Sequence, residues 1–123
     1  MKCQTSKLIG SALDWVVAKC EEYRYGKSED TEELVLIGME FVEWNPSTNW
    51  SQGGPIIERE KLDVWFRVEV VMPNHKNQWA ATYERGLLDS YVFGPTPLIA
   101  AMRCYVASKL GEEIEIPKEL KCK

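Results

Sequence analysis

The sequence lacks most of the residue patterns that mark catalytic and cofactor sites. It has one histidine, His75, and its four cysteines form no CxxC pair, so we expect no zinc site, which needs a set of such ligands. There is no GxxxxGK[ST] or GxGxxG loop for the phosphates of a nucleotide, and no GxSxG nucleophile elbow. His75 lies in the turn-forming stretch PNHKN, so a Ser-His-Asp triad would have to draw its base from a turn. The sequence therefore predicts neither a metal nor a cofactor.

Charge and the length of the apolar runs limit the class of partner. The net charge is −4, whereas a protein that reads a phosphate backbone needs a basic face. No segment approaches the roughly 20 apolar residues that span a bilayer. The first apolar run is interrupted by Asp14 and Lys19, unlike that of a secretory signal. We therefore expect a reduced, cytoplasmic protein that binds neither nucleic acid nor a membrane.

Hydrophobic periodicity predicts a single α+β domain over residues 1–123. Apolar residues recur at helical spacing in two segments. The first covers residues 5–24 and is capped by Thr5 or Ser6, and the second is capped by Thr96 and ends at Gly111. Segments that alternate or are rich in β-branched and aromatic residues predict strands at 34–44, 62–72, 78–84, 90–93 and 113–117. The expected fold is a mostly antiparallel sheet with two helices packed on one face.

Residues 45–60, NPSTNWSQGGPIIERE, are polar and rich in turn formers, and we predict a loop there. So long a stretch without secondary structure is uncommon in a compact domain, which favours a role beyond connection. In a ligand site, Trp50 would stack on a planar ring while Gly53 and Gly54 let backbone amides approach the ligand. In a purely structural loop, Trp50 would instead be buried in the core. The sequence leaves both interpretations open.

A second candidate binding feature is the start of the later helix. Free amides and the helix dipole attract anions at such a position, and the Thr96 hydroxyl adds a contact. A plainly capped helix is the alternative, and Pro97 removes one donor. Arg103 lies six residues beyond Pro97, so it need not face the same ligand.

Three acidic residues are the remaining candidates for catalytic chemistry. Asp14 lies beside Trp15 near the apolar face of the first helix, where a partly buried acid needs a hydrogen-bond partner. Glu58 and Glu60 alternate with basic residues, which is typical of a solvated surface with weak ion pairs.

Three segments together resemble a known family. They are KLIGSALDWVVAKCE, STNWSQGGPIIERE and GPTPLIAAMRCYVASKLGEEIEIP, and they resemble the NinX-like family of small proteins from temperate phages of enteric bacteria. The resemblance implies a phage accessory protein that acts in the bacterial cytoplasm. It also implies one surface that is assembled from the matching segments 13–15, 50–55 and 94–103.

These observations leave three functional hypotheses. The first is a non-catalytic module that binds a small polar or nucleotide-like ligand at a site that a homo-oligomer would complete. The second is a factor that binds and modulates a host protein, and the third is an enzyme that uses Asp14 or Glu58. For the first hypothesis the candidate ligand-binding residues are Asp14, Trp50, Ser51, Gly53, Gly54, Thr96 and Arg103.

Overall fold

The computed structural model describes residues 1–27, 34–36, 43–67, 78–83, 91–118 and 120. This part of the chain holds three α-helices, one short 3-10 helix and three small antiparallel sheets, so the predicted α+β class is confirmed. In chain order the elements are β1 (Lys2–Gln4), η1 (Thr5–Lys7), α1 (Gly10–Cys20), β2 (Tyr25–Lys27), β3 (Leu34–Leu36), α2 (Trp50–Glu60), β4 (Asp63–Arg67), β5 (Gln78–Thr82), β6 (Val92–Gly94), α3 (Pro97–Leu110) and β7 (Glu113–Glu115).

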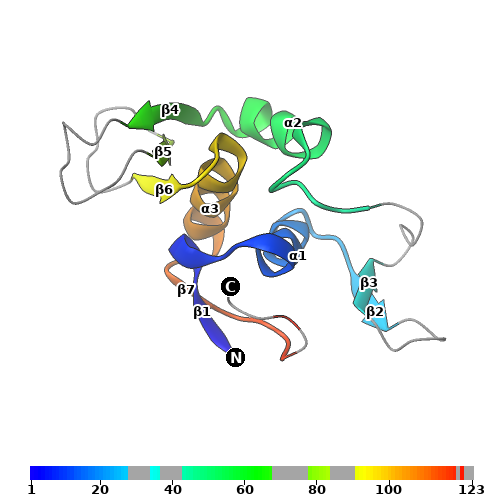
Figure 1. The fold of residues 1–123 in the computed structure, drawn as a ribbon. Coiled ribbons are helices and arrows are strands. Elements are labelled where there is room, and N and C mark those ends of the chain that lie inside the picture. Colours follow the sequence, from blue (N-terminus) through cyan, green and yellow to red (C-terminus); the bar gives the residue numbers. More distant parts are fainter. Residues whose placement is uncertain (28–33, 37–42, 68–77, 84–90, 119, 121–123) are drawn as a thin grey trace.

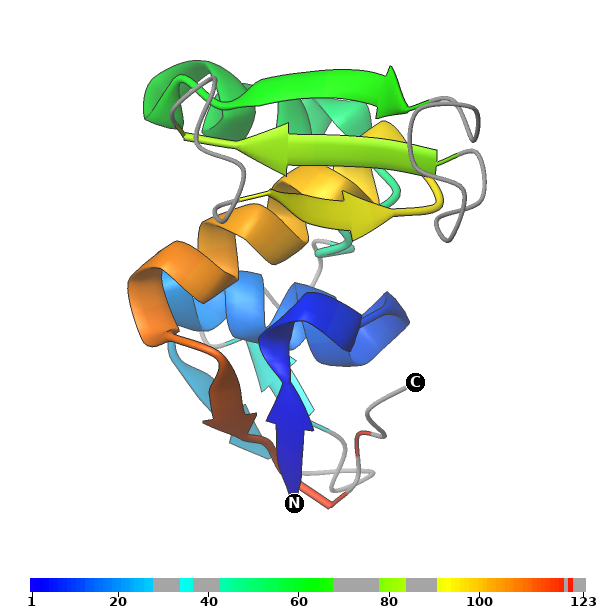
Figure 2. The same ribbon diagram turned by 90° about the vertical axis from the view of Figure 1, so that its left-hand side faces the viewer.

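Helix α3 is the centre of the molecule. It lies between the three-stranded sheet β4-β5-β6 and helix α1, and α2 packs beside it (Figures 1 and 2). The predicted caps are confirmed: Thr96 Oγ1 accepts a hydrogen bond from the Ile99 amide at 3.1 Å, and Gly111, at a φ of 88°, ends the helix. Its buried residues are Leu98, Ile99, Ala100, Ala101, Met102, Cys104, Tyr105 and Val106. A helix that is apolar on nearly every side is expected where neighbours cover it all round.

The sheet against α3 is formed by three consecutive antiparallel strands. In β4 and β5 the antiparallel register pairs Trp65 with Ala80 and Phe66 with Trp79. Strand β6 approaches α3 closely because Gly94 has no side chain: a Cβ there would lie 2.6 Å from the Ala100 amide nitrogen. The part of the predicted strand 62–72 that follows Arg67 lies outside the described residues.

The N-terminal helix is shorter than the sequence predicts. Residues Thr5–Lys7 form η1, and α1 begins only at Gly10, with Ile9 as an N-cap that makes no side-chain bond. Thr5 does not cap a helix, because its hydroxyl donates to the Gly111 carbonyl at 2.7 Å. The chain before α1 is thus bound to the end of α3, and β1 pairs with β7 in a two-stranded ribbon that continues this contact. Strand β7 was predicted, whereas β1 was not.

Three further expectations differ from the structure or lie outside it. Cys3 is disulfide-bonded, so the prediction of a fully reduced chain is wrong there, while Cys20 and Cys104 are free thiols. The predicted strand 34–44 is confirmed over Leu34–Leu36, which pairs with β2 in a hairpin to one side of the body (Figure 1). Residues 37–42 of that prediction lie outside the described residues, and residues 43 and 44 are not in a strand. His75 lies outside the described residues. None of the described helices combines the length and the hydrophobicity that a membrane span requires.

Candidate functional site

The predicted loop at residues 45–60 is wrong over most of its length, because Trp50–Glu60 forms helix α2. Gly53, Gly54 and Pro55 disfavour a helix locally, but other interactions outweigh this preference. The Asn49 side chain caps the first turn by accepting from the Ser51 amide at 3.0 Å. Ile56, only 2% exposed, is buried in the common core and draws the helix onto the domain.

Trp50, the first residue of α2, is not a core anchor. Its side chain is 57% exposed, the most exposed large apolar side chain among the described residues. It lies at the rim of a pocket of about 220 Å³. The lining residues are Ser47, Thr48, Trp50, Thr96, Pro97 and Leu98. The pocket therefore joins two of the residues that the sequence singled out, Trp50 and Thr96, across the starts of α2 and α3.

Two helix N-termini thus meet at one pocket, and each presents backbone donors. The first amides of a helix have no partner within that helix, which applies here to Trp50 in α2 and Leu98 in α3. The next donors are already used, since the Ser51 amide is bound by Asn49 Oδ1 and the Ile99 amide by Thr96 Oγ1. Because both helix dipoles have their positive ends at this position, the pocket favours a ligand group with negative or partial negative charge.

Ser47 forms the inner wall of this pocket. It is 1% exposed, and its backbone amide donates to Asp14 Oδ1 at 2.9 Å. Its buried hydroxyl lies beside the same carboxyl and lowers the pKa of that group. Ser47 therefore faces Asp14 with both its backbone amide and its side chain.

Asp14 supports the pocket from behind and does not line it. Burial raises the pKa of its carboxyl, and the hydrogen bond from the Ser47 amide opposes that rise. Its backbone carbonyl accepts from the Trp44 indole nitrogen at 2.9 Å. Asp14 thus positions the segment that carries Ser47, which is a structural use of a buried acid.

The other predicted site residues lie outside the pocket lining. Gly53 faces the protein: a Cβ there would lie 2.5 Å from the Pro46 carbonyl oxygen and 2.6 Å from Leu98 Cδ2, so the residue lets α2 pack closely. Gly54 lies beside the Trp50 ring, and Ser51 is exposed and bonded to the cap. None of the three contributes to the described pocket wall.

Arg103 is also outside this pocket. Its guanidinium donates to the Leu8 carbonyl at 2.8 Å and to the Phe93 carbonyl at 2.9 Å. Burial lowers its pKa. The side chain therefore ties β6 and the segment before α1 to the middle of α3.

A polar cluster at the other end of the helices was missed by the sequence analysis. Arg59 forms a two-pronged ion pair with Glu21, at 2.9 and 2.7 Å, and bonds Glu60 at 3.0 Å. Tyr105 donates to Glu21 at 2.5 Å, and Tyr83 donates to Glu60 at 3.0 Å. The prediction of a solvated acidic face holds for Glu58, which is exposed, but Glu60 is half-buried within this cluster. The cluster joins all three helices and the end of β5.

The ionised form of each acid in this cluster is stabilised by hydrogen bonds. Burial would raise the pKa of Glu21, but the hydrogen bonds from Arg59 and Tyr105 outweigh it and lower that pKa. The same balance, with Arg59 and Tyr83 as donors, lowers the pKa of Glu60. Acids that are paired this firmly are poor general bases, so the cluster is best explained as a clamp between the helices. Among the described residues, no group of three or more His, Cys, Asp or Glu side chains could hold a metal ion.

Comparison with known proteins adds the family. A family model described as Bacteriophage P22, NinX matches residues 4–109, which is well over half of the 123-residue chain. A comparison with curated proteins found no match. The matched range contains α1, α2 and all but the last residue of α3, and hence every residue that lines the pocket beside Trp50. The chain belongs to the NinX family and is a phage accessory protein.

Proposed function

We propose that this protein is a non-catalytic binding module for a small ligand that joins a planar ring to a polar or anionic group, as a nucleotide does. One observation carries the proposal: an exposed indole stands beside two converging helix N-termini at a single pocket. The two parts of the ligand would bind by different interactions. The ring would stack on the Trp50 indole, and the polar group would accept hydrogen bonds from the backbone amides of Trp50 and Leu98.

Stacking on Trp50 supplies the first half of the binding. Base–aromatic stacking contributes about 1–3 kcal/mol per base and tolerates any base, because every base has a π-face. Because Trp50 is 57% exposed in the free protein, its indole has accessible surface that a ligand ring can bury. Since the indole belongs to the first turn of a helix, its position is set before a ligand arrives, which lowers the entropy cost of binding.

The pocket supplies the second half. The Trp50 and Leu98 amides belong to residues that line the pocket, and its described lining has no charged side chain. Hydrogen bonds to an anionic acceptor are about twice as strong as those between neutral groups. The volume of about 220 Å³ is below the roughly 300–1,000 Å³ of most ligand pockets. The pocket therefore suits one polar group, with the ring outside on Trp50 or enclosed by a second copy of the chain.

The test is a set of NMR titrations with adenosine monophosphate, adenosine and inorganic phosphate. We expect the nucleotide to bind more tightly than either fragment, with shifts at the amides of Trp50 and Leu98. Trp50→Ala should weaken nucleotide binding at least tenfold, about 1.4 kcal/mol. Phe66→Ala is the matched control, because Phe66 is also exposed, at 47%, but does not line the pocket.

Two results would count against the proposal. One is equal binding of the nucleotide by the wild type and by Trp50→Ala. The other is the absence of binding across all four common nucleoside monophosphates together with their cyclic forms.

The alternative is a factor that binds a host protein. The same exposed Trp50 supports it, since tryptophan is enriched among the residues that dominate protein interfaces. A stoichiometric host protein that is recovered with the wild type and lost with Trp50→Ala, in a preparation that binds no nucleotide, would favour this alternative.

A further inference from the structure

A second and larger cavity lies at the other half of α3. Its volume is about 450 Å³, within the range of roughly 300–1,000 Å³ that accommodates small molecules. Its walls come from β1 and η1, the end of β5, the start of β6, α3, and the segment that enters β7. The side chains that matter for its chemistry are Tyr83, Tyr91, Cys104, Ser108, Glu112 and Glu113. It shares no lining residue with the pocket beside Trp50.

The aromatic part of the wall is fixed in position. Tyr83 is tied through its hydroxyl to Glu60 at 3.0 Å. The ring of Tyr91 meets Trp65 edge to face, with the ring centres 5.0 Å apart. Preformed aromatic surfaces of this kind bind the apolar body of a ligand with little loss of conformational freedom, and they attract cations through their π-faces.

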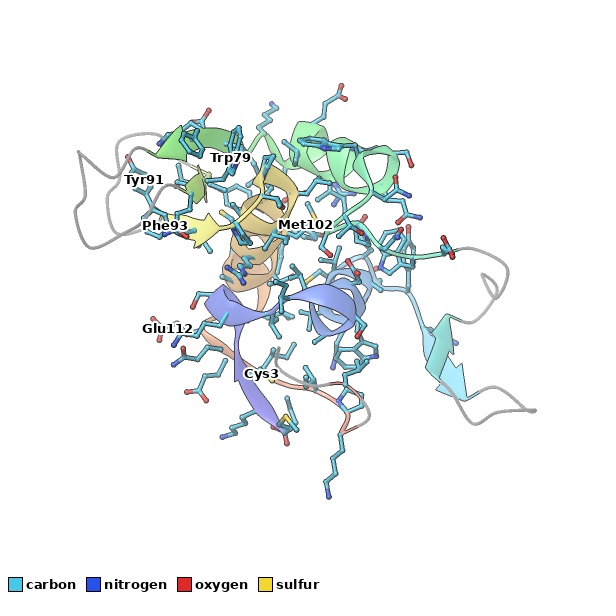
Figure 3. All side chains as sticks on the ribbon, viewed as in Figure 1. Cys3, Trp79, Tyr91, Phe93, Met102 and Glu112 are labelled. Carbon is cyan, nitrogen blue, oxygen red and sulfur yellow. The ribbon has the colours of Figure 1, made fainter. Side chains whose placement is uncertain are left out.

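The charged part of the wall is of one sign. Glu112 and Glu113 are the charged side chains in the lining, and no lysine or arginine is among the described residues that line the cavity. Both residues are exposed, and neither forms an ion pair with a described basic residue. Figure 3 shows Glu112 on the same side of the molecule as Tyr91. The net charge of −4 adds a general attraction for cations.

One further polar group also favours a donor as the ligand. The Ser108 hydroxyl already donates its proton to the Tyr105 carbonyl, so within the lining its oxygen is left as an acceptor. The Cys104 thiol, 3% exposed, is a soft and weakly polar part of the inner wall. Acceptors, carboxylates and tyrosine rings together match an ammonium group, which has three donors and no acceptor.

We propose that this cavity binds a small primary amine, with the ammonium group at Glu112 and Glu113 and the apolar body against the rings of Tyr83 and Tyr91. The inference is independent of the function proposed for the Trp50 pocket. The two sites differ in charge preference: the Trp50 pocket favours anions, and this cavity repels them.

The test uses three probes with the same phenyl body and different charge. Phenethylamine is a cation at pH 7, 2-phenylethanol is neutral, and 3-phenylpropanoate is an anion. In NMR titrations of the wild type we expect phenethylamine to bind about tenfold more tightly than 2-phenylethanol, because each carboxylate near 4 Å contributes a Coulomb attraction even in water. The shifted amides should be those of the cavity wall, and 3-phenylpropanoate should bind most weakly.

Two double variants assign the effect to the two carboxylates. Glu112→Gln with Glu113→Gln should abolish the preference for the amine, so that phenethylamine and 2-phenylethanol bind alike. Glu43→Gln with Glu58→Gln removes the same net charge at exposed residues that do not line the cavity, and it should keep the preference. All four substitutions are at exposed side chains, so the fold should be retained.

The proposal is overturned if 2-phenylethanol binds as tightly as the amine in the wild type, or if the Glu112/Glu113 variant keeps the preference. Failure of all three probes to shift any amide of the cavity wall would overturn it as well. None of these results would bear on the Trp50 pocket.

Discussion

Two neighbouring glycines of α2 should respond to the same substitution in opposite ways. A Cβ at Gly53 would lie 2.5 Å from the Pro46 carbonyl oxygen and 2.6 Å from Leu98 Cδ2. Because the first of these is backbone, the helix itself has to move. At Gly54 the nearest atom is Trp50 Cε3 at 3.9 Å, which is an ordinary contact. Alanine should therefore destabilise the protein at Gly53 and stabilise it at Gly54.

The magnitudes follow from two opposing terms. Replacing a helical glycine by alanine stabilises by about 1 kcal/mol, whereas overpacking a close contact costs about 1–3 kcal/mol. Because both distances from a Cβ at Gly53 are well below 3 Å, we use the upper part of the range for overpacking. Gly53→Ala should then lower the free energy of unfolding by about 1–2 kcal/mol, and Gly54→Ala should raise it by about 0.5–1 kcal/mol.

Urea unfolding of the two variants beside the wild type measures both values. In thermal unfolding, each kcal/mol corresponds to about 3–5 °C for a chain of this size. A Gly53→Ala variant as stable as Gly54→Ala would refute the close packing of α2 against the start of α3. Since that contact forms the Trp50 pocket, it would also remove the structural basis of the proposed site.

Two further predictions concern the polar contacts that Arg59 and Arg103 make. Glu21 and Glu60 have lowered pKa values in the folded protein, so they bind fewer protons there than in the unfolded chain, and their contribution is lost as the pH falls below about 4.5, the ordinary value. Arg59→Met should make the loss of stability between pH 5 and pH 3 shallower in urea titrations; an unchanged pH dependence would contradict the assigned ion pairs. Arg103→Met leaves two partly buried carbonyls without their donor and should cost about 1–3 kcal/mol. Ligand binding at the Trp50 pocket should stay unchanged, and a loss of binding by folded Arg103→Met would show that Arg103 belongs to the site after all.

The elements with strong local signals were predictable from the sequence. Helix α3 has a threonine cap, a proline at its first position and a terminal glycine, and each of these acts within a few residues. The pairing of β4 with β5 follows from alternation and a turn cluster. Because these signals are local, the fold class could be predicted from the sequence.

Helix α2 was not predicted because the run Gly53–Pro55 argues against a helix and outweighs the local signal of Asn49 as an N-cap. The burial of Ile56 against residues from elsewhere in the chain explains why the helix forms. Composition likewise could not decide whether Trp50 is buried, since tryptophan occurs in both environments. The structure answers that question: the indole is exposed at the start of a helix.

The polar cluster was missed for a similar reason. Glu21 and Arg59 are 38 residues apart, and their ion pair exists only because α1 and α2 end on the same side of α3. No spacing in the sequence marks such a pair. The Trp50–Thr96 pocket has the same character, because it joins the starts of two helices that are far apart in the chain. For this pocket the family resemblance implied a shared surface, and the fold brings Trp50 and Thr96 of that surface together.

Native mass spectrometry of the wild type and of Trp50→Ala, both purified gently from a bacterial host, is the most direct test of ligand binding at the Trp50 pocket. We expect the wild type to retain a small molecule that is released on denaturation and carries a planar ring and a polar or anionic group. Folded Trp50→Ala should lose it, and the same spectra give the oligomeric state. The same adduct on both proteins, or a wild type that remains without ligand even in the presence of millimolar nucleoside monophosphates, would contradict the account.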